Sequence, residues 1–232
     1  MNVATILAIT AGMMFGILSL AYKYANLKKC RSAQFTFALS LSAAGVTFFK
    51  SLTETSIWSD PLLWGLGAVM GIVIVAGIFV LMAANRLGPV SSSWTVVNVS
   101  FLLAIFLSAI VLRERLLCVD PINLAIFGLT LYLFVRGMRA ESGMSKPVSH
   151  TFLHLLTLLG VFLTNGLVAF ASKLKYTFWS QANTSALPTV FYLVSALITL
   201  VMIQRQSGRL DIAKDEWKAG AMGGLLMSIG TL

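Results

Sequence analysis

Residues 83–116, AANRLGPVSSSWTVVNVSFLLAIFLSAIVLRERL, decide the fold because they contain a turn between two long apolar segments. Gly88 and Pro89 cannot continue a helix, so the first segment ends there and the chain reverses its direction. The 23 residues 89–111 contain no Asp, Glu, Lys or Arg, which predicts a membrane-spanning helix. Charged residues return at 113–115, where this helix would leave the bilayer.

The composition of the whole chain is that of a membrane protein. Hydrophobic residues make up 58% of the 232 residues and charged residues only 11%, against about 25% in soluble domains. The apolar segments are long and lack the alternation of barrel strands. The predicted fold class is therefore all-α: a polytopic membrane helical bundle whose partner is the lipid bilayer. We expect a multi-pass protein of a bacterial inner (plasma) membrane.

The stretch quoted above resembles the EamA-type domain of the drug/metabolite transporter superfamily. In that family a third helix ends in an alanine-rich turn, a fourth begins at a small polar run, and a Glu between basic residues closes it. The family often has a proline midway along this helix, where the present chain has Asn98-Val99-Ser100. The features that carry the resemblance are Ala83-Ala84, Gly88-Pro89-Val90-Ser91-Ser92 and Leu112-Arg113-Glu114-Arg115-Leu116.

Apolar segments and helix-start signals predict about eight helices. Asp60-Pro61 and Asp120-Pro121 each supply an N-cap followed by proline at the first helical position. A signal peptide is an alternative for the first span, but no basic residue precedes its apolar run, so we expect a retained helix. The predicted spans are 3–22, 33–49, 62–82, 89–111, 122–135, 151–172, 185–203 and an eighth that begins near Trp217.

Two parts of the chain are related by an internal repeat. At an offset of 153 positions, five residues of the third span match five of the eighth. Because five spans precede the second copy, the copies have opposite orientations in the membrane. We therefore predict two inverted five-helix repeats: a first EamA-like repeat at 1–137, a linker at 138–149 and a partial second repeat at 150–232. The matched residues are Trp64, Gly67, Ala68, Gly71 and Gly77, and Trp217, Gly220, Ala221, Gly224 and Gly230.

The repeat also predicts that the second half is truncated. Leu232 corresponds to position 232 − 153 = 79, inside the third span, whereas the first repeat continues to about Gly137. By this comparison about 58 residues (137 − 79) are absent from the second half. We expect the chain to need a second chain that supplies the missing helices, which makes a homodimer a candidate assembly.

Small polar residues mark a candidate substrate site in the fourth span. Trp94 and Asn98 are four residues apart, with Thr95 alongside, and share one face of a helix. That face would offer an indole for apolar contact and an amide to orient a polar group of a metabolite. The alternative is interhelical packing, with Asn98 bonded to a neighbouring backbone. In both cases we expect Trp94 and Asn98 to face the protein interior. Weaker candidates of the same kind are Asn165, Ser19 and Tyr22.

Two further residue pairs each allow a functional interpretation. Lys23 and Lys173 correspond at an offset of 150 and would attract an anionic substrate, but such lysines more often extend to the membrane interface. His150 and His154 have the i, i+4 spacing of a metal-binding pair, yet no Cys or further His is available to complete a site. We expect interfacial positions for all four residues, with no metal and no cofactor.

No acidic residue falls inside a predicted span, and this absence argues against several functions. The eight Asp and Glu residues all lie in connections or at helix ends. Small multidrug members of the resembled superfamily exchange protons for cations on a membrane-embedded Glu, so proton-coupled drug antiport is disfavoured here. Neither an Asp pair nor a Ser/His constellation lies at membrane depth, so we expect that the protein is not an enzyme.

The net charge of +9 reflects membrane topology rather than nucleic-acid binding, because the basic residues lie in short connections between spans. Twelve of the 17 Lys and Arg residues fall in the first, third, fifth and seventh connections and five on the other side. This imbalance predicts a cytoplasmic location for those four connections and an N-terminus outside. The family resemblance implies the reverse orientation.

The resemblance implies a secondary transporter that moves a small organic metabolite across a membrane by alternating access between the two halves. The residues themselves indicate only a polytopic bundle with a polar lining. The alternative is a non-transporting membrane scaffold or a degenerate, truncated family member.

Overall fold

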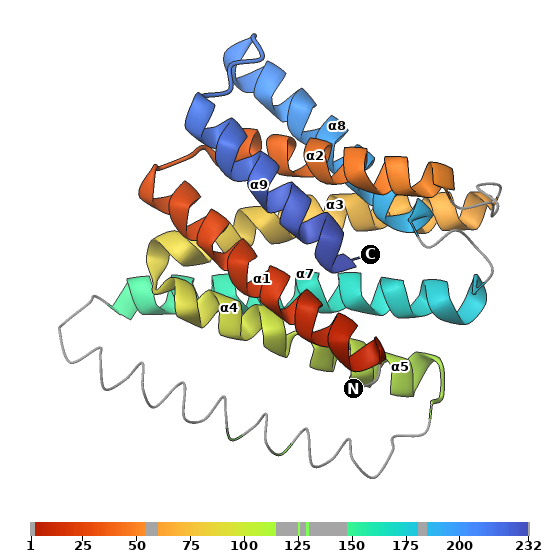
Figure 1. The fold of residues 1–232 in the computed structure, drawn as a ribbon. Helices are drawn as coiled ribbons and strands as arrows, with labels where there is room; N and C mark the ends of the chain where they lie inside the picture. The colour runs from red at the N-terminus through yellow and green to blue at the C-terminus, as the bar shows by residue number, and fades with distance from the viewer. Residues whose placement is uncertain are drawn as a thin grey trace.

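A computed structural model describes residues 3–53, 60–114, 125, 129, 148–180 and 185–231. Within these residues all regular secondary structure is helical (Figure 1). Five helical segments are long and apolar enough to cross a membrane: α2, α3, the combined α4 and α5, residues 152–178 of α7, and α8. The chain is therefore an integral membrane protein whose described part is a bundle of helices. The helices are α1 (Val3–Leu27), α2 (Ser32–Thr53), α3 (Pro61–Leu87), α4 (Val90–Val99), α5 (Phe101–Val111), α7 (Val148–Phe178), α8 (Ala186–Ser207) and α9 (Lys214–Thr231).

Helices occupy seven of the eight predicted spans, and in five of these seven the described helix is long and apolar enough to cross a membrane. Most of them run several residues beyond the apolar stretch, because a helix continues into the polar residues that flank a membrane core. The fifth predicted span, 122–135, lies outside the described residues except for Ala125 and Leu129, which are both helical. Most of the predicted linker, 138–149, also lies outside them, and α7 already begins at its end, at Val148.

Local sequence signals set the two ends of α3. The Asp60 carboxylate accepts a hydrogen bond from the Leu62 N–H at 2.8 Å, and Pro61 occupies the first turn, where its missing N–H costs nothing. At the other end Gly88 has an extended backbone and donates to the Ala84 carbonyl before Pro89 begins the next segment. The predicted helix start and the predicted reversal are both confirmed.

The predicted fourth span is one path of two helices, α4 and α5, with an irregular turn at Ser100. The Ser100 hydroxyl donates to the Val97 carbonyl at 2.6 Å, and the Leu103 N–H donates to the Ser100 carbonyl, three residues back. Hydrogen bonds between residues three positions apart tighten a helix locally, and they replace the regular bonds between residues four positions apart. Gly166 of α7 packs against this turn: a Cβ there would lie 2.8 Å from the Ser100 carbonyl oxygen.

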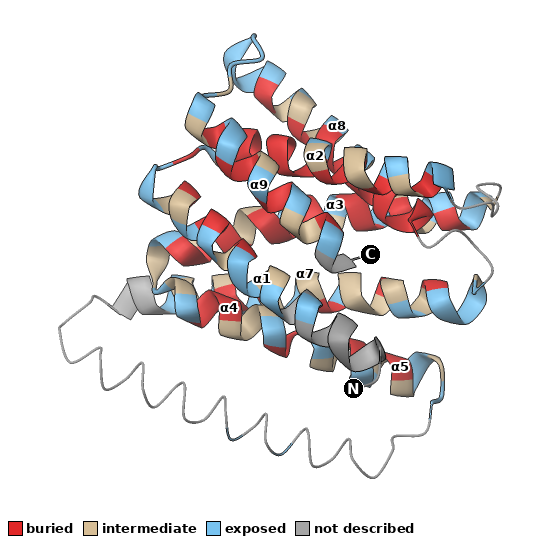
Figure 2. Ribbon diagram, viewed as in Figure 1, coloured by how far each residue is buried: buried red, intermediate tan, exposed pale blue. Residues whose placement is uncertain are grey.

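Three helices, α2, α3 and α8, are the most buried of the candidate membrane spans (Figure 2). Between 50% and 61% of the residues in their apolar windows are buried, compared with 33% for α4–α5 and 22% for α7. On one side α9 packs against α1 and α2, and on the other α7 packs against α3, α4 and α5 (Figure 1). At the contact of α2 with α8, the hydroxyl oxygens of Ser40 and Ser195 lie 2.7 Å apart.

Paired glycines allow two of these contacts to be close. A Cβ on Gly71 of α3 would lie 2.8 Å from the Phe191 carbonyl oxygen of α8. A Cβ on Gly224 of α9 would lie 2.2 Å from the Leu39 carbonyl oxygen of α2. Both helices therefore use glycine to bring one backbone against another, as small residues commonly do between membrane helices.

Candidate functional site

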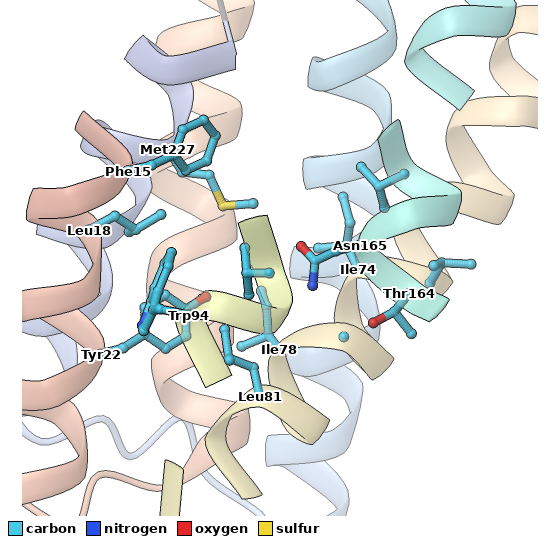
Figure 3. A pocket seen from close by; sticks show the side chains of 14 residues that line it. Phe15, Leu18, Tyr22, Ile74, Ile78, Leu81, Trp94, Thr164, Asn165 and Met227 are labelled. Atoms are coloured by element: carbon cyan, nitrogen blue, oxygen red, sulfur yellow. The ribbon is translucent and has the colours of Figure 1, made fainter. Parts of the chain in front are cut away.

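A small cavity lies at the junction of α1, α3, α4, α7 and α9 (Figure 3). Its volume is about 50 Å³. Apolar side chains from α1 and α3 form most of the wall, and Met227 contributes from α9. The cavity thus lies among the helices of the first half and the two helices α7 and α9, which follow the predicted linker.

Three of the six predicted substrate-site residues line this cavity: Tyr22, Trp94 and Asn165. The rings of Tyr22 and Trp94 meet edge to face with centroids 5.6 Å apart. Tyr22 also packs edge to face on Phe35 of α2, at 5.0 Å. These contacts hold both aromatic rings in fixed orientations, because edge-to-face pairs favour a defined geometry.

The indole of Trp94 carries a buried hydrogen-bond donor beside the cavity. Only 9% of the residue is exposed, and its indole N–H has no hydrogen-bond partner among the described residues. A buried donor without a partner is uncommon in folded proteins because losing its bond to water costs free energy. The nitrogen is itself buried, so an acceptor group of a ligand would reach it only after the surrounding helices move.

Asn165 provides the polar group on the α7 side. Figure 3 shows its amide directed from α7 toward the part of the cavity where Trp94 and Tyr22 lie. One amide N–H donates to the Val161 carbonyl at 3.1 Å, one turn earlier in the same helix. That bond orients the side chain and leaves its oxygen able to accept a bond from a ligand.

A close approach of α3 and α7 shapes the wall beside Asn165. Gly77 and Thr164 both line the cavity, and a Cβ on Gly77 would lie 3.0 Å from the Thr164 hydroxyl oxygen. The sequence repeat includes Gly77, but its role in letting Thr164 approach was not predicted. Every residue that lines the cavity is uncharged.

The other three predicted site residues do not line the cavity. The hydroxyls of Ser19 and Thr95 donate to carbonyl groups of their own helices, Gly16 and Ser91, at 2.6 and 2.9 Å. Asn98 is exposed, contrary to the expectation that it faces the interior. The interior face of α4 passes through Trp94 and Val97, which are three residues apart, so a residue four positions after Trp94 falls beyond its edge.

Two residues considered in the sequence for other roles take part in contacts between helices. Lys173 of α7 forms an ion pair with Glu114, just beyond α5, with an N–O distance of 2.9 Å and both side chains more than 40% exposed. His154 packs against Gly88, and its Nε2 lies 3.4 Å from the Ser92 hydroxyl oxygen. The side chain of His150 lies outside the described residues.

A buried carboxylate joins the α1–α2 connection to α9, and sequence reasoning missed this contact. Arg31 donates three hydrogen bonds to Glu216, two to Oε1 at 2.9 Å and one to Oε2 at 3.0 Å. The Ala213 N–H also donates to Glu216, which closes a capping turn at the start of α9. Burial disfavours the ionised form of Glu216, but these hydrogen bonds outweigh burial, so the pKa of Glu216 lies below its usual value.

A second carboxylate, that of Asp60, joins the start of α3 to the end of α7. The Trp179 indole, just after α7, donates a hydrogen bond to the Asp60 carboxylate at the start of α3. This bond, with the one from the Leu62 N–H, lowers the pKa of Asp60. Asp60 and Glu216 are recognisable in the sequence as acidic residues at the starts of helices. The sequence does not show which distant residue each carboxylate would contact.

Comparison with known protein families and curated sequences finds no match. The chain matches no model of a known protein family and no curated protein sequence. Fold and site therefore define a class only: an integral membrane protein built from a helical bundle, with a small uncharged cavity among its helices.

Proposed function

We propose that the chain is a secondary carrier that moves a small organic metabolite across a membrane by alternating access. The cavity carries this proposal, because it lies between α1, α3 and α4 of the first predicted repeat and α7 and α9 of the second. Carriers built from inverted repeats bind their substrates at the interface of the repeats. Tyr22, Trp94 and Asn165 would supply the polar contacts to the substrate.

The pattern of helix contacts supports the two inverted repeats. In the predicted repeat α1, α2 and α3 correspond to α7, α8 and α9. If the two repeats are equivalent, each contact should also occur between the corresponding helices. The contact of α3 with α8 should recur between α9 and α2. The contact of α3 with α7 should recur between α9 and α1. All four contacts exist. Gly71 and Gly224, which match at the offset of 153, make the equivalent close approaches.

The carboxylates of Asp60 and Glu216 support a mechanism in which one contact between helices closes each side of the membrane. Asp60–Trp179 joins α3 to the end of α7, and Glu216–Arg31 joins α9 to the end of α1. These two contacts are equivalent in the predicted repeat, because α3 corresponds to α9 and α7 corresponds to α1. They lie at opposite ends of the bundle. An alternating-access carrier needs one closure on each side of the membrane. We infer that each contact opens while the other holds.

The size and chemistry of the cavity restrict the substrate. About 50 Å³ is too small for an organic metabolite, since ligand sites usually measure about 300–1,000 Å³. The described arrangement would therefore be a closed state that opens by movement of α7 and α9 against the first half. Because the lining carries no charge, the part of the substrate that enters it would be uncharged.

The family assignment remains a proposal that rests on the residues between Ala83 and Leu116. The irregular turn at Ser100 adds one observation in its favour. It interrupts the helix at the place where the resembled EamA-type domain often has a proline, so a break is present there without the proline.

The same small cavity favours a second candidate function, a non-transporting membrane scaffold. Exchange experiments on the pure protein separate the two. Liposomes that contain the protein are loaded with a mixture of isotope-labelled small metabolites and placed in the unlabelled mixture. A carrier would release one chemical class of labelled compound faster than protein-free liposomes do. A scaffold would release all of them at the protein-free rate.

A further inference from the structure

A second, basic hollow lies where α1 leads into α2 and where α3 ends. The residues that line it are Asn26, Lys29, Arg31, Ser32 and Arg86. It is a wide depression that is open to the surface of the bundle. It shares no lining residue with the cavity beside Trp94, so it is a separate feature of the molecule.

The hollow carries positive charge that the described residues do not balance. Three of its lining residues are basic and none is acidic. Arg31 is neutralised by Glu216 and lies 3.5 Å from an Asp211 oxygen. In the part of the chain that the structure describes, Lys29 and Arg86 form no ion pair with a carboxylate. Two cations therefore face the hollow without a counter-ion.

A hydrogen bond orients the Arg86 cation, and the turn between α1 and α2 sets the position of the Lys29 backbone. Arg86 donates from Nη2 to the Cys30 carbonyl at 2.7 Å, which uses one of the five N–H donors of its guanidinium group. Lys29 has a left-handed backbone, with φ of 52°, at the turn between α1 and α2. Asn26 donates to the Asn85 carbonyl at 2.8 Å and so ties the end of α1 to the end of α3.

The position of the hollow identifies the anion that would fill it. The candidate span α2 begins at Ser32, and the candidate span α3 ends at Leu87, so the hollow lies where two spans leave the apolar layer. Lipid phosphates occupy that level of a bilayer. Arg and Lys side chains bind phosphate oxygens, and basic pockets on the cytoplasmic side of membrane proteins attract anionic headgroups.

We propose that this hollow binds the phosphodiester headgroup of an anionic phospholipid through Lys29 and Arg86. The proposal does not depend on the transport function. The lipid would connect α1, α2 and α3 at the face of the bundle that the Lys and Arg distribution predicts to be cytoplasmic.

Binding of fluorescent phosphatidylglycerol to the full chain in neutral detergent tests this proposal. The variants are Lys29→Gln, Arg86→Gln and the double substitution. Each lost charge should weaken binding about fivefold and both together about 25-fold, and phosphatidylcholine should bind far more weakly than phosphatidylglycerol. The matched control is Arg209→Gln, an exposed residue just after α8 near the same face, which should bind like the unmodified protein.

Lys29→Gln keeps the test valid if Arg86→Gln disturbs the fold, because the Lys29 ammonium makes no hydrogen bond or ion pair among the described residues. The proposal is overturned if the Lys29 variant and the control bind phosphatidylglycerol equally, or if phosphatidylcholine binds as tightly. A competition arm uses inorganic phosphate at millimolar concentration. Full displacement of the lipid by phosphate would assign the hollow to a free anion and overturn the lipid assignment.

Discussion

Arg31 and Glu216 are 185 positions apart in the sequence and are joined by three hydrogen bonds. The Glu216 side chain is only 5% exposed, whereas that of Arg31 is 45% exposed. A single carboxylate at the first turn of α9 therefore holds the α1–α2 connection against the second half of the chain. If this contact is a closure of a carrier, breaking it should loosen one end of the bundle and leave the other end unchanged.

Glu216→Gln should lower the free energy of unfolding by about 1.5–3 kcal/mol, because a buried hydrogen-bonded charge is lost and Arg31 keeps its own charge. Unfolding of the purified protein in detergent measures this change. A second readout is thiol labelling of Cys30, which is 2% exposed beside Arg31 and should label faster in the variant. Cys118 is replaced by Ser in both proteins so that Cys30 is the only cysteine.

Glu114→Gln is the matched control for that substitution. Glu114 also pairs with a basic residue, Lys173, but both side chains are more than 40% exposed, so the pair should contribute less than about 1 kcal/mol. Equal losses of stability in the two variants, with unchanged labelling of Cys30, would contradict the assigned role of Glu216.

Stability should also fall in acid. Because the pKa of Glu216 is lower in the folded protein than its usual value of 4.5, the unfolded chain binds more protons as the pH drops below that value. The stabilisation is therefore complete above the usual pKa and is lost as the pH falls through the folded pKa. Unfolding curves between pH 7 and pH 3 should show a smaller acid-induced loss for Glu216→Gln than for the unmodified protein. Parallel losses in the two proteins would be incompatible with this account.

Local features of the fold were predictable from the sequence, whereas contacts between distant segments were not. Asp60-Pro61 and Gly88-Pro89 set the ends of α3 because each acts on its own backbone within a few residues. The partner of Glu216 depends on how α9 packs against α1 and α2, which no local pattern encodes. Asn98 shows a related limit: an i, i+4 spacing places two residues near one face but does not fix where that face ends.

Two glycine substitutions test the predicted correspondence of α3 and α9. Gly71→Ala and Gly224→Ala should each destabilise the protein by about 1–3 kcal/mol, because the added Cβ would collide with a neighbouring carbonyl oxygen. Gly65→Ala is the control within α3, since a Cβ there meets nothing within 4 Å. It should be neutral or stabilising by about 0.5–1 kcal/mol. A tolerated alanine at only one of the two positions would argue against equivalent packing.

Trp94→Phe tests the unpartnered indole donor of the cavity. The phenyl ring keeps most of the packing on Tyr22, but the N–H is lost, so uptake or binding of the substrate found in the exchange experiment should weaken about 2- to 12-fold. Protein stability should change little. The matched control is Trp217→Phe in α9, where the ring is 43% exposed and away from the cavity. A larger effect at Trp217 than at Trp94 would remove Trp94 from the site.

The sequence analysis placed its candidates on the first, fourth and sixth spans. Tyr22, Trp94 and Asn165 reach the cavity, but the other three candidates lie on two of the same spans and do not line it. What it did not anticipate is the size of the cavity, since a volume depends on every side chain around it. The apolar wall from α3, including Ile74 and Ile78, gave no signal of its own, because its pattern is that of any buried membrane helix.

The most direct test of alternating access measures from which side of the membrane a thiol at position 165 can be reached. Asn165→Cys is made in a chain with Cys30 and Cys118 replaced by Ser, and membrane-impermeant reagent is applied to right-side-out and inside-out vesicles. Adding Glu216→Gln should increase labelling from the side of the α8–α9 connection, and adding Asp60→Asn should increase it from the opposite side. Labelling that rises from the same side in both variants, or in neither, would show that the two contacts are not the closures of an alternating-access carrier.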